Sequence, residues 1–97
     1  MESIRNFQTF QDYLREKQVF DRFGLSRIGV FGSFARGEAF RDIDLLIEDD
    51  VPYKKLIQLR DDLQQDLGVQ VDIMLKPFAE PIILNRALKD IRYATRQ

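Results

Sequence analysis

Three aspartates are the residues of this chain whose type and spacing are best suited to chemistry. Asp42 and Asp44 stand two residues apart in a β-rich stretch, so their carboxylates project from one face of a predicted strand. Asp72 alternates with the apolar Val71 and Ile73 in another such stretch, and we expect its carboxylate to point the same way. If the two strands are neighbours, three carboxylates converge on one face of a sheet.

An unneutralised cluster of this kind would weaken a small domain. Two carboxylates about 5 Å apart repel by roughly 3 kcal/mol at an effective dielectric of about 20, whereas a whole domain is stable by only about 5–15 kcal/mol. The carboxylates must therefore be protonated, paired with arginine or neutralised by a cation. Arg41 is the rival partner, but as the residue before Asp42 it should project to the opposite side of the strand.

The donor types favour a hard divalent cation as the neutralising group. The chain contains no His and no Cys, and oxygen-only ligands suit Mg²⁺ or Mn²⁺. The alternative is that Asp42, Asp44 and Asp72 are simply solvated on an exposed sheet face, but aspartate is depleted in strands. We therefore predict that these three residues are metal ligands.

Composition excludes several other kinds of chemistry. Without His or Cys there is no Ser–His–Asp triad, thiolate nucleophile, disulfide scaffold or His/Cys zinc site among the 97 residues. A net charge of −1 argues against a protein that coats nucleic acid. The N-terminus lacks the layout of a signal peptide, and no apolar run is long enough to span a membrane. We expect a soluble, cytoplasmic, single domain covering residues 1–97.

A possible phosphate site follows the first predicted strand. Gly32 permits a sharp turn and a close approach of phosphate to the backbone. If a helical turn follows, its free N–H groups and the Ser33 hydroxyl form an anion site, and Arg36 can reach a phosphate oxygen. Alone the pattern is weak, because Gly-Ser after a strand is usually only a loop and such an arginine is usually only a surface charge.

The elements that must position these residues follow from periodicity. The predicted order is a helix at 3–23 broken near residues 17–18, a strand at 25–31, a loop with one helical turn at 32–41, a strand at 42–48, a helix at 53–67, a strand at 69–75 and a helix at 79–94. This order predicts an α+β fold with a small mixed β-sheet and helices packed mainly on one face. We expect the aspartates to lie on the other, open face. Aromatic residues of the first helix are expected in the core, with a partner interface as the alternative: Phe7, Phe10, Tyr13 and Phe20.

The stretch from Gly32 to Ala39, followed by Asp42 to Ile47, closely resembles the signature of the DNA polymerase β nucleotidyltransferase superfamily. The strand around Asp72 resembles that of its minimal branch, called MNT, and the resemblance covers nearly the whole chain. It implies the polymerase β-like nucleotidyltransferase fold. In this sequence only eight residues separate Ser33 from Asp42, about two fewer than is usual in the family, and Arg41 stands where relatives commonly have serine.

The resemblance also implies roles for the singled-out residues. Gly32 and Ser33 would hold the β and γ phosphates of a nucleoside triphosphate. Asp42 and Asp44 would bind two Mg²⁺ ions, for which Mn²⁺ can substitute, and Asp72 would share one ion and help to activate an acceptor hydroxyl. All three aspartates would thus be catalytic as well as metal-binding.

The function implied is Mg²⁺-dependent transfer of a nucleotidyl group, AMP from ATP, to a hydroxyl of a partner. MNT proteins are often paired with a HEPN-domain ribonuclease toxin, for which they act as antitoxin. The expected partners are thus ATP or another nucleoside triphosphate and a HEPN-domain protein, with no membrane, no extensive nucleic-acid binding, and a homo-oligomer left open. The alternatives are a catalytically weak nucleotide-binding antitoxin that masks its partner, and a small α+β domain with incidental aspartates.

Overall fold

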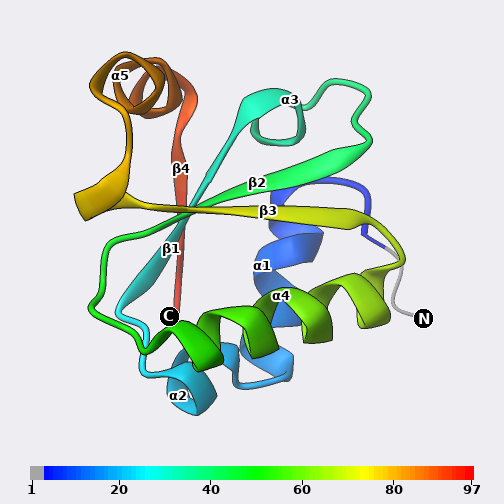
Figure 1. The fold of residues 1–97 in the computed structure, drawn as a ribbon. Helices are drawn as coiled ribbons and strands as arrows, with labels where there is room; N and C mark the ends of the chain where they lie inside the picture. The colour runs from blue at the N-terminus through cyan, green and yellow to red at the C-terminus, as the bar shows by residue number, and fades with distance from the viewer. Residues whose placement is uncertain (1–3) are drawn as a thin grey trace.

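The computed structural model describes residues 4–97 and contains a four-stranded mixed sheet (Figure 1). The strands are β1 (Arg27–Phe31), β2 (Asp42–Ile47), β3 (Gln70–Leu75) and β4 (Arg92–Thr95). Their order is β3-β2-β1-β4, in which β1 is antiparallel to β2 and β4, while β2 is parallel to β3. The predicted α+β class with a small mixed sheet is confirmed.

Three helices cover one face of this sheet. They are α1 (Phe7–Glu16), α2 (Val19–Phe23) and α4 (Tyr53–Leu67), and Figure 1 shows them together on the same side. Because β2 and β3 are parallel, the chain must cross over between them, and α4 makes that crossover. The core lies between these helices and the sheet. The predicted start of the first helix at residue 3 lies outside the described residues.

The predicted break in the N-terminal helical region is confirmed. Gln18 has a φ of 55°, in the left-handed region, so the helix cannot continue through it, and Gly24 ends α2 with a φ of 68°. The bend lets both short helices turn apolar side chains to the sheet. The predicted core role of the aromatic residues is confirmed, since each is buried: Phe7, Phe10, Tyr13 and Phe20.

Three short elements lie outside that helical layer. They are α3 (Gly32–Ala35), a 3₁₀ turn η1 (Lys76–Phe78) and α5 (Pro81–Asp90). Proline at the first position of α5 is tolerated, as predicted, because that amide has no partner within the helix. The Glu80 side chain caps α5 by accepting hydrogen bonds from two amides of its first turn at 3.3 and 3.2 Å.

The predicted helix over 79–94 is wrong at its C-terminal end, where β4 replaces it. Ile91 is extended, and its side chain occupies space that a Cβ at Gly29 would enter, 2.5 Å from Ile91 Cδ1. The following residues pair with the open edge of β1, and the Thr95 amide donates to Gln11 Oε1 at 3.0 Å. The local apolar spacing continues the helix, but pairing with β1 satisfies the backbone groups of these residues as strand β4 and covers the edge of β1.

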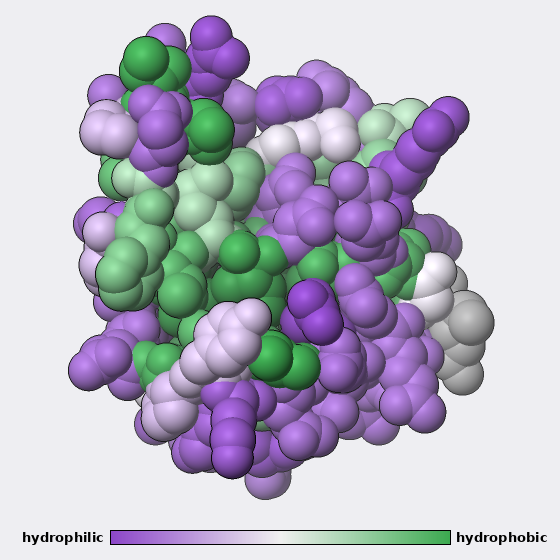
Figure 2. Space-filling view, in the orientation of Figure 1, coloured by the Kyte–Doolittle hydropathy of each residue, from purple (hydrophilic) through white to green (hydrophobic). Residues whose placement is uncertain are grey.

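Within residues 4–97, no helix has both the length and the apolar character that a membrane crossing requires. The space-filling view nevertheless shows apolar side chains gathered on the surface over β3 and towards α5 (Figure 2). Four of the exposed large apolar side chains belong to η1 and α5: Phe78, Ile82, Ile83 and Leu88.

Candidate active site

The sheet register brings two of the predicted aspartates side by side. Asp44 on β2 is the Cα partner of Asp72 on β3, and adjacent strands lie roughly 4.8 Å apart. Asp42 precedes Asp44 by two residues on the same strand and is the partner of Gln70. Both β2 aspartates are half-buried, whereas the intervening Ile43 is fully buried in the core. The alternation read from the sequence thus places the carboxylates on the face away from the main helical layer.

This arrangement of carboxylates disfavours the ionisation of Asp44. Burial, followed by the negative charges of Asp72 and Asp42, raises the pKa of the Asp44 carboxyl above its ordinary value. Within residues 4–97, none of the three carboxylates forms an ion pair, and Asp72 only accepts a hydrogen bond from Gln70 Nε2 at 3.3 Å. The cluster is therefore not neutralised by arginine.

The three carboxylates are neighbours, but their side chains are not arranged to coordinate a metal ion together. No group of three or more acidic, His or Cys side chains in the described part of the chain has a metal-binding arrangement. The register of β2 and β3 brings the three residues close together. The side chains of Asp42, Asp44 and Asp72 nevertheless remain spread along the sheet face. Their role as metal ligands stays a prediction.

The start of α3 packs directly against Asp44. Gly32 follows β1 without a connecting loop and has a φ of 79°, which favours glycine. A Cβ at this position would collide with Asp44 Oδ2. The backbone angle therefore favours glycine here, and any side chain at this position would displace the Asp44 carboxylate.

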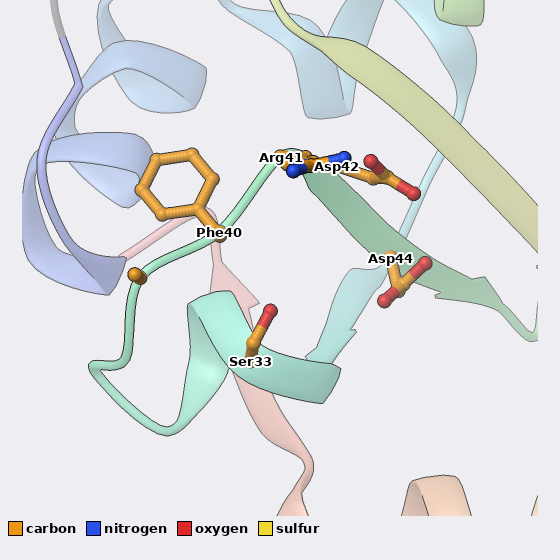
Figure 3. A pocket seen from close by; sticks show the side chains of 6 residues that line it. Ser33, Phe40, Arg41, Asp42 and Asp44 are labelled. Carbon is orange, nitrogen blue, oxygen red and sulfur yellow. The ribbon is translucent and has the colours of Figure 1, made fainter.

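A pocket of about 510 Å³ opens beside this contact. Figure 3 shows Ser33 from α3 and Asp44 from β2 projecting into the same space, with Asp42 further along the strand. The predicted juxtaposition of the serine with the paired aspartates is therefore present. The lining residues are Ser33, Ala39, Phe40, Arg41, Asp42 and Asp44.

Arg41 is not separated from the aspartates, contrary to the expectation from strand alternation. It lines the same pocket as Asp42 and Asp44 (Figure 3). The reason is that β2 begins only at Asp42, so the alternation of the strand does not extend to the residue before it. Among the described residues that line this pocket, Arg41 is the one basic side chain.

Phe40 is a pocket residue that sequence reasoning missed. Its ring meets Phe34 edge-on, with centroids 4.6 Å apart, and Phe34 in turn meets Phe10 at 5.8 Å. These contacts tie the loop between α3 and β2 to the core. The sequence signal that could have identified Phe40 is its position as an isolated aromatic residue in a polar loop.

Arg36 is not brought to the pocket. Its guanidinium donates to Glu38 at 3.0 Å and to Asp90 at 2.9 Å, and these hydrogen bonds raise its pKa. The second contact joins the end of α3 to the end of α5. A phosphate contact by Arg36 would require these ion pairs to open, and it stays a prediction.

A second pocket, of about 620 Å³, also includes Asp44 in its lining. It contains both Asp44 and Asp72 and is otherwise lined mostly by apolar residues of β3, η1 and α5. Sequence reasoning did not find it, because it forms only where η1 and α5 fold back beside the sheet. Asp44 is the residue that the two pockets share.

Comparison with known proteins agrees with this geometry. Residues 11–94 match the model of the nucleotidyltransferase domain family. The protein adenylyltransferase MntA of Thermococcus cleftensis is 37% identical over 82 residues, which are 80% of this chain and 83% of that protein. A solved minimal nucleotidyltransferase is 29% identical, with a TM-score of 0.67 over 90% of this chain and 94% of that one.

The fold also matches that of a solved complex between a tri-AMPylated Shewanella oneidensis HEPN toxin and an MNT antitoxin. The TM-score is 0.61 at 20% identity, over 90% of this chain and 73% of that one. At this identity the likeness concerns the fold. The chain therefore belongs to the nucleotidyltransferase domain family and is a minimal nucleotidyltransferase related to MntA.

Proposed function

We propose that this protein is a protein adenylyltransferase that transfers AMP from ATP to a hydroxyl of a HEPN-domain toxin and so acts as its antitoxin. The observation that carries the proposal is the placement of Asp44 beside Asp72, directly against the glycine that begins α3. The similarity to a protein adenylyltransferase, and to the fold of an antitoxin solved with an AMPylated HEPN toxin, supports the chemistry and the partner.

The triphosphate would lie in the pocket on the Ser33 side of Asp44. Gly32 leaves the backbone accessible at this turn, the Ser33 hydroxyl can donate to a phosphate oxygen, and Arg41 supplies positive charge. Arg41 lines this pocket because β2 begins only at Asp42, one residue after it. Arg41 would then partly replace the phosphate contacts expected of Arg36.

The acidic cluster suits the divalent metal that this family generally uses. Its donors are all oxygens, its charges have no protein counter-ion in residues 4–97, and the burial of Asp44 makes that charge costly without one. Asp42, Asp44 and Asp72 would hold two Mg²⁺ ions, with Mn²⁺ able to substitute. When bound, such ions stabilise charge on the leaving pyrophosphate and lower the pKa of the acceptor hydroxyl.

The transfer itself exchanges a phosphoanhydride bond of ATP for a phosphoester bond to the acceptor. The oxygen of the acceptor hydroxyl forms a bond to the α-phosphorus of ATP. The bond from that phosphorus to the oxygen that bridges to the β-phosphate breaks, and its electron pair leaves with pyrophosphate. Asp72 is exposed to solvent, so it can accept the hydroxyl proton and pass it to water.

The test is labelling of a HEPN-domain partner by ATP that carries the label on its α-phosphate, with Mg²⁺ present. Wild type should transfer the label, and Asp44→Asn should abolish transfer while remaining folded. Asp50→Asn is the matched control, because Asp50 is exposed and follows the same strand without lining either pocket. Transfer that survives Asp44→Asn would refute the proposed role of the carboxylates.

A nucleotide-binding antitoxin that masks its partner without chemistry is the second candidate. The observation in its favour is that Asp42, Asp44 and Asp72 do not close into a ligand set in the described residues. In that case wild type would bind ATP and silence the toxin, yet no label would appear on the toxin under any metal.

A further inference from the structure

The second pocket forms a groove with two chemically different parts. Two acidic residues of the sheet, Asp44 and Asp72, line one part of it. Its walls are apolar and come from four separate elements, namely β1, β3, η1 and α5. Figure 2 shows apolar side chains gathered on this side of the molecule, over β3 and towards α5. The wall residues that matter here are Phe31, Met74, Phe78 and Ile83.

Two wall residues are strongly exposed for their type. Phe78 is 85% exposed and Ile83 is 50% exposed. Single exposed apolar residues need no explanation, but a set that lines one groove next to a reactive centre indicates a binding surface. The Glu80 cap fixes the start of α5 between these two residues, so the wall is held in place without a ligand.

The charges of the groove select against phosphate-bearing ligands. No Lys or Arg occurs among the described residues that line it. Its third carboxylate, on Glu80, already accepts hydrogen bonds from the amides of Ile82 and Ile83. The described residues of the groove walls therefore offer no basic side chain to the phosphates on either side of an acceptor residue in a polynucleotide. The pocket on the Ser33 side, by contrast, contains Arg41.

We propose that this groove binds the acceptor as a polypeptide segment, with apolar side chains on either side of the hydroxyl-bearing residue. The inference rests on the proposed function, because it assigns the nucleotide to the pocket on the Ser33 side. Asp44 belongs to both pockets, so an acceptor in this groove and a triphosphate in the other pocket would meet at its carboxylate. Phe78 and Ile83 are then positioning residues for the acceptor and not for ATP.

The experiment measures binding and transfer separately. One probe is a fluorescent peptide with a single tyrosine flanked by leucines, and the others are the same peptide with aspartates in their place and a short oligoribonucleotide with a free 3′ hydroxyl. The variants are Phe78→Ser and Ile83→Ser. Ile82→Ser is the matched control, since this neighbour on α5 is 62% exposed but does not line the groove.

Wild type should bind the leucine peptide more tightly than the aspartate peptide, and Ile83→Ser and Phe78→Ser should each weaken that binding by about tenfold. The affinity for ATP with Mg²⁺ should stay unchanged in both variants, and Ile82→Ser should behave as wild type. Circular dichroism and the melting temperature establish that each variant is folded.

The outcomes separate the two proposals. Equal binding of both peptides, an equal effect of Ile82→Ser and Ile83→Ser, or label transfer to the oligoribonucleotide would overturn the acceptor groove. Loss of ATP affinity in Phe78→Ser would also overturn it, since the groove would then hold the nucleotide. Selective binding of the leucine peptide, with no transfer to any acceptor, would support the acceptor groove and refute the proposed adenylyltransferase activity.

Discussion

The carboxylate of Asp44 occupies the space that a side chain at Gly32 would need. This contact joins β2 to the first residue of α3, so the proposed metal ligand and the proposed phosphate turn are in direct contact. A side chain at Gly32 would therefore displace the Asp44 carboxylate from its present position. The relationship makes the geometry of the site testable through stability as well as through activity.

Gly32→Ala should destabilise the protein more than Gly37→Ala. Both glycines have φ angles near 80°, at 79° and 77°, so both variants incur a backbone cost of about 1–2 kcal/mol. A Cβ at Gly37 meets nothing within 4 Å, whereas one at Gly32 meets Asp44. Urea unfolding at neutral pH measures the difference, which isolates the contact with Asp44.

A second background provides the control for that contact. When Asp44→Ala is already present, Gly32→Ala should cost about as much as Gly37→Ala, because the carboxylate is gone. An unchanged excess cost of Gly32→Ala in the Asp44→Ala background would contradict the packing relationship.

Asp44→Asn should stabilise the metal-free protein at neutral pH. The carboxyl pKa in the folded protein is raised above its ordinary value of 3.8, first by burial and then by Asp72 and Asp42. The unfolded chain therefore ionises more readily, and the folded state loses stability as the pH rises from 3.8 through the raised pKa. Melting temperatures of wild type and Asp44→Asn should diverge from pH 3.5 to pH 7, with the variant higher at pH 7.

Divalent metal should raise the melting temperature of wild type above that of variants that lack the Asp44 carboxylate. Mn²⁺ at about 100 times its dissociation constant adds about 2.7 kcal/mol of stability to a protein that binds it only when folded. The melting temperature of wild type should rise with Mn²⁺ and fall back with a chelator, while Asp42→Asn/Asp44→Asn should not respond. Asp50→Asn should respond as wild type, and an equal rise in all three proteins would exclude the acidic cluster as the binding site.

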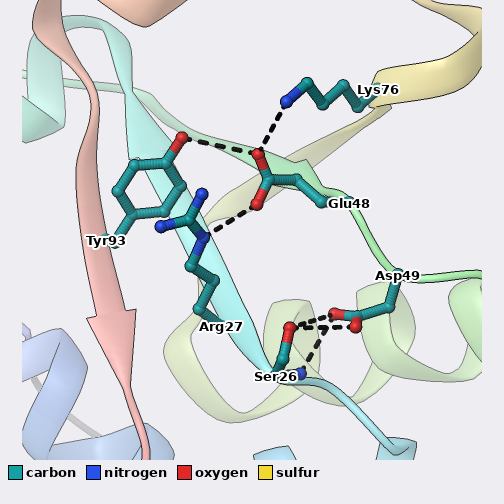
Figure 4. Close-up of polar contacts among 6 residues, drawn as sticks. All are labelled: Ser26, Arg27, Glu48, Asp49, Lys76 and Tyr93. Carbon is teal, nitrogen blue, oxygen red and sulfur yellow. Dashed lines mark hydrogen bonds and ion pairs between the residues drawn. The ribbon is translucent and has the colours of Figure 1, made fainter.

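Glu48→Gln should destabilise the protein, with the opposite pH dependence. Figure 4 shows the Glu48 carboxylate between Arg27, Lys76 and Tyr93, which donate to it at 2.8, 3.2 and 3.5 Å. The hydrogen bond from Arg27 is the main cause that lowers the carboxyl pKa below its ordinary value of 4.5. The stabilisation is therefore present above pH 4.5 and disappears as the pH falls through the lowered pKa.

The expected loss for Glu48→Gln at pH 7 is about 1–2 kcal/mol, measured by urea unfolding, because the side chain is only 17% exposed. Glu38→Gln is the control, since the Glu38 side chain is 56% exposed and its contact with Arg36 should contribute only about 0–1 kcal/mol. Equal losses in the two variants would mean that burial does not set the strength of the Glu48 contacts.

The sequence alone determined those features that depend on short periods. Alternation with a period of two placed Asp42 and Asp44 on one face of a strand, and apolar spacing of three and four residues predicted α4 over residues 53–67. The break between α1 and α2 was also local, because it occurs at a single residue with positive φ, Gln18. These features are encoded by neighbours in the chain.

Tertiary structure decided what depends on partners far apart in the chain. The final residues form β4 because the edge of β1 is free, although their own spacing continues a helix. Arg41 reaches the pocket because β2 begins one residue after it, and the groove beside Asp72 exists only because η1 and α5 fold back against the sheet. Each outcome is set by pairing or packing between segments whose contact no local pattern records.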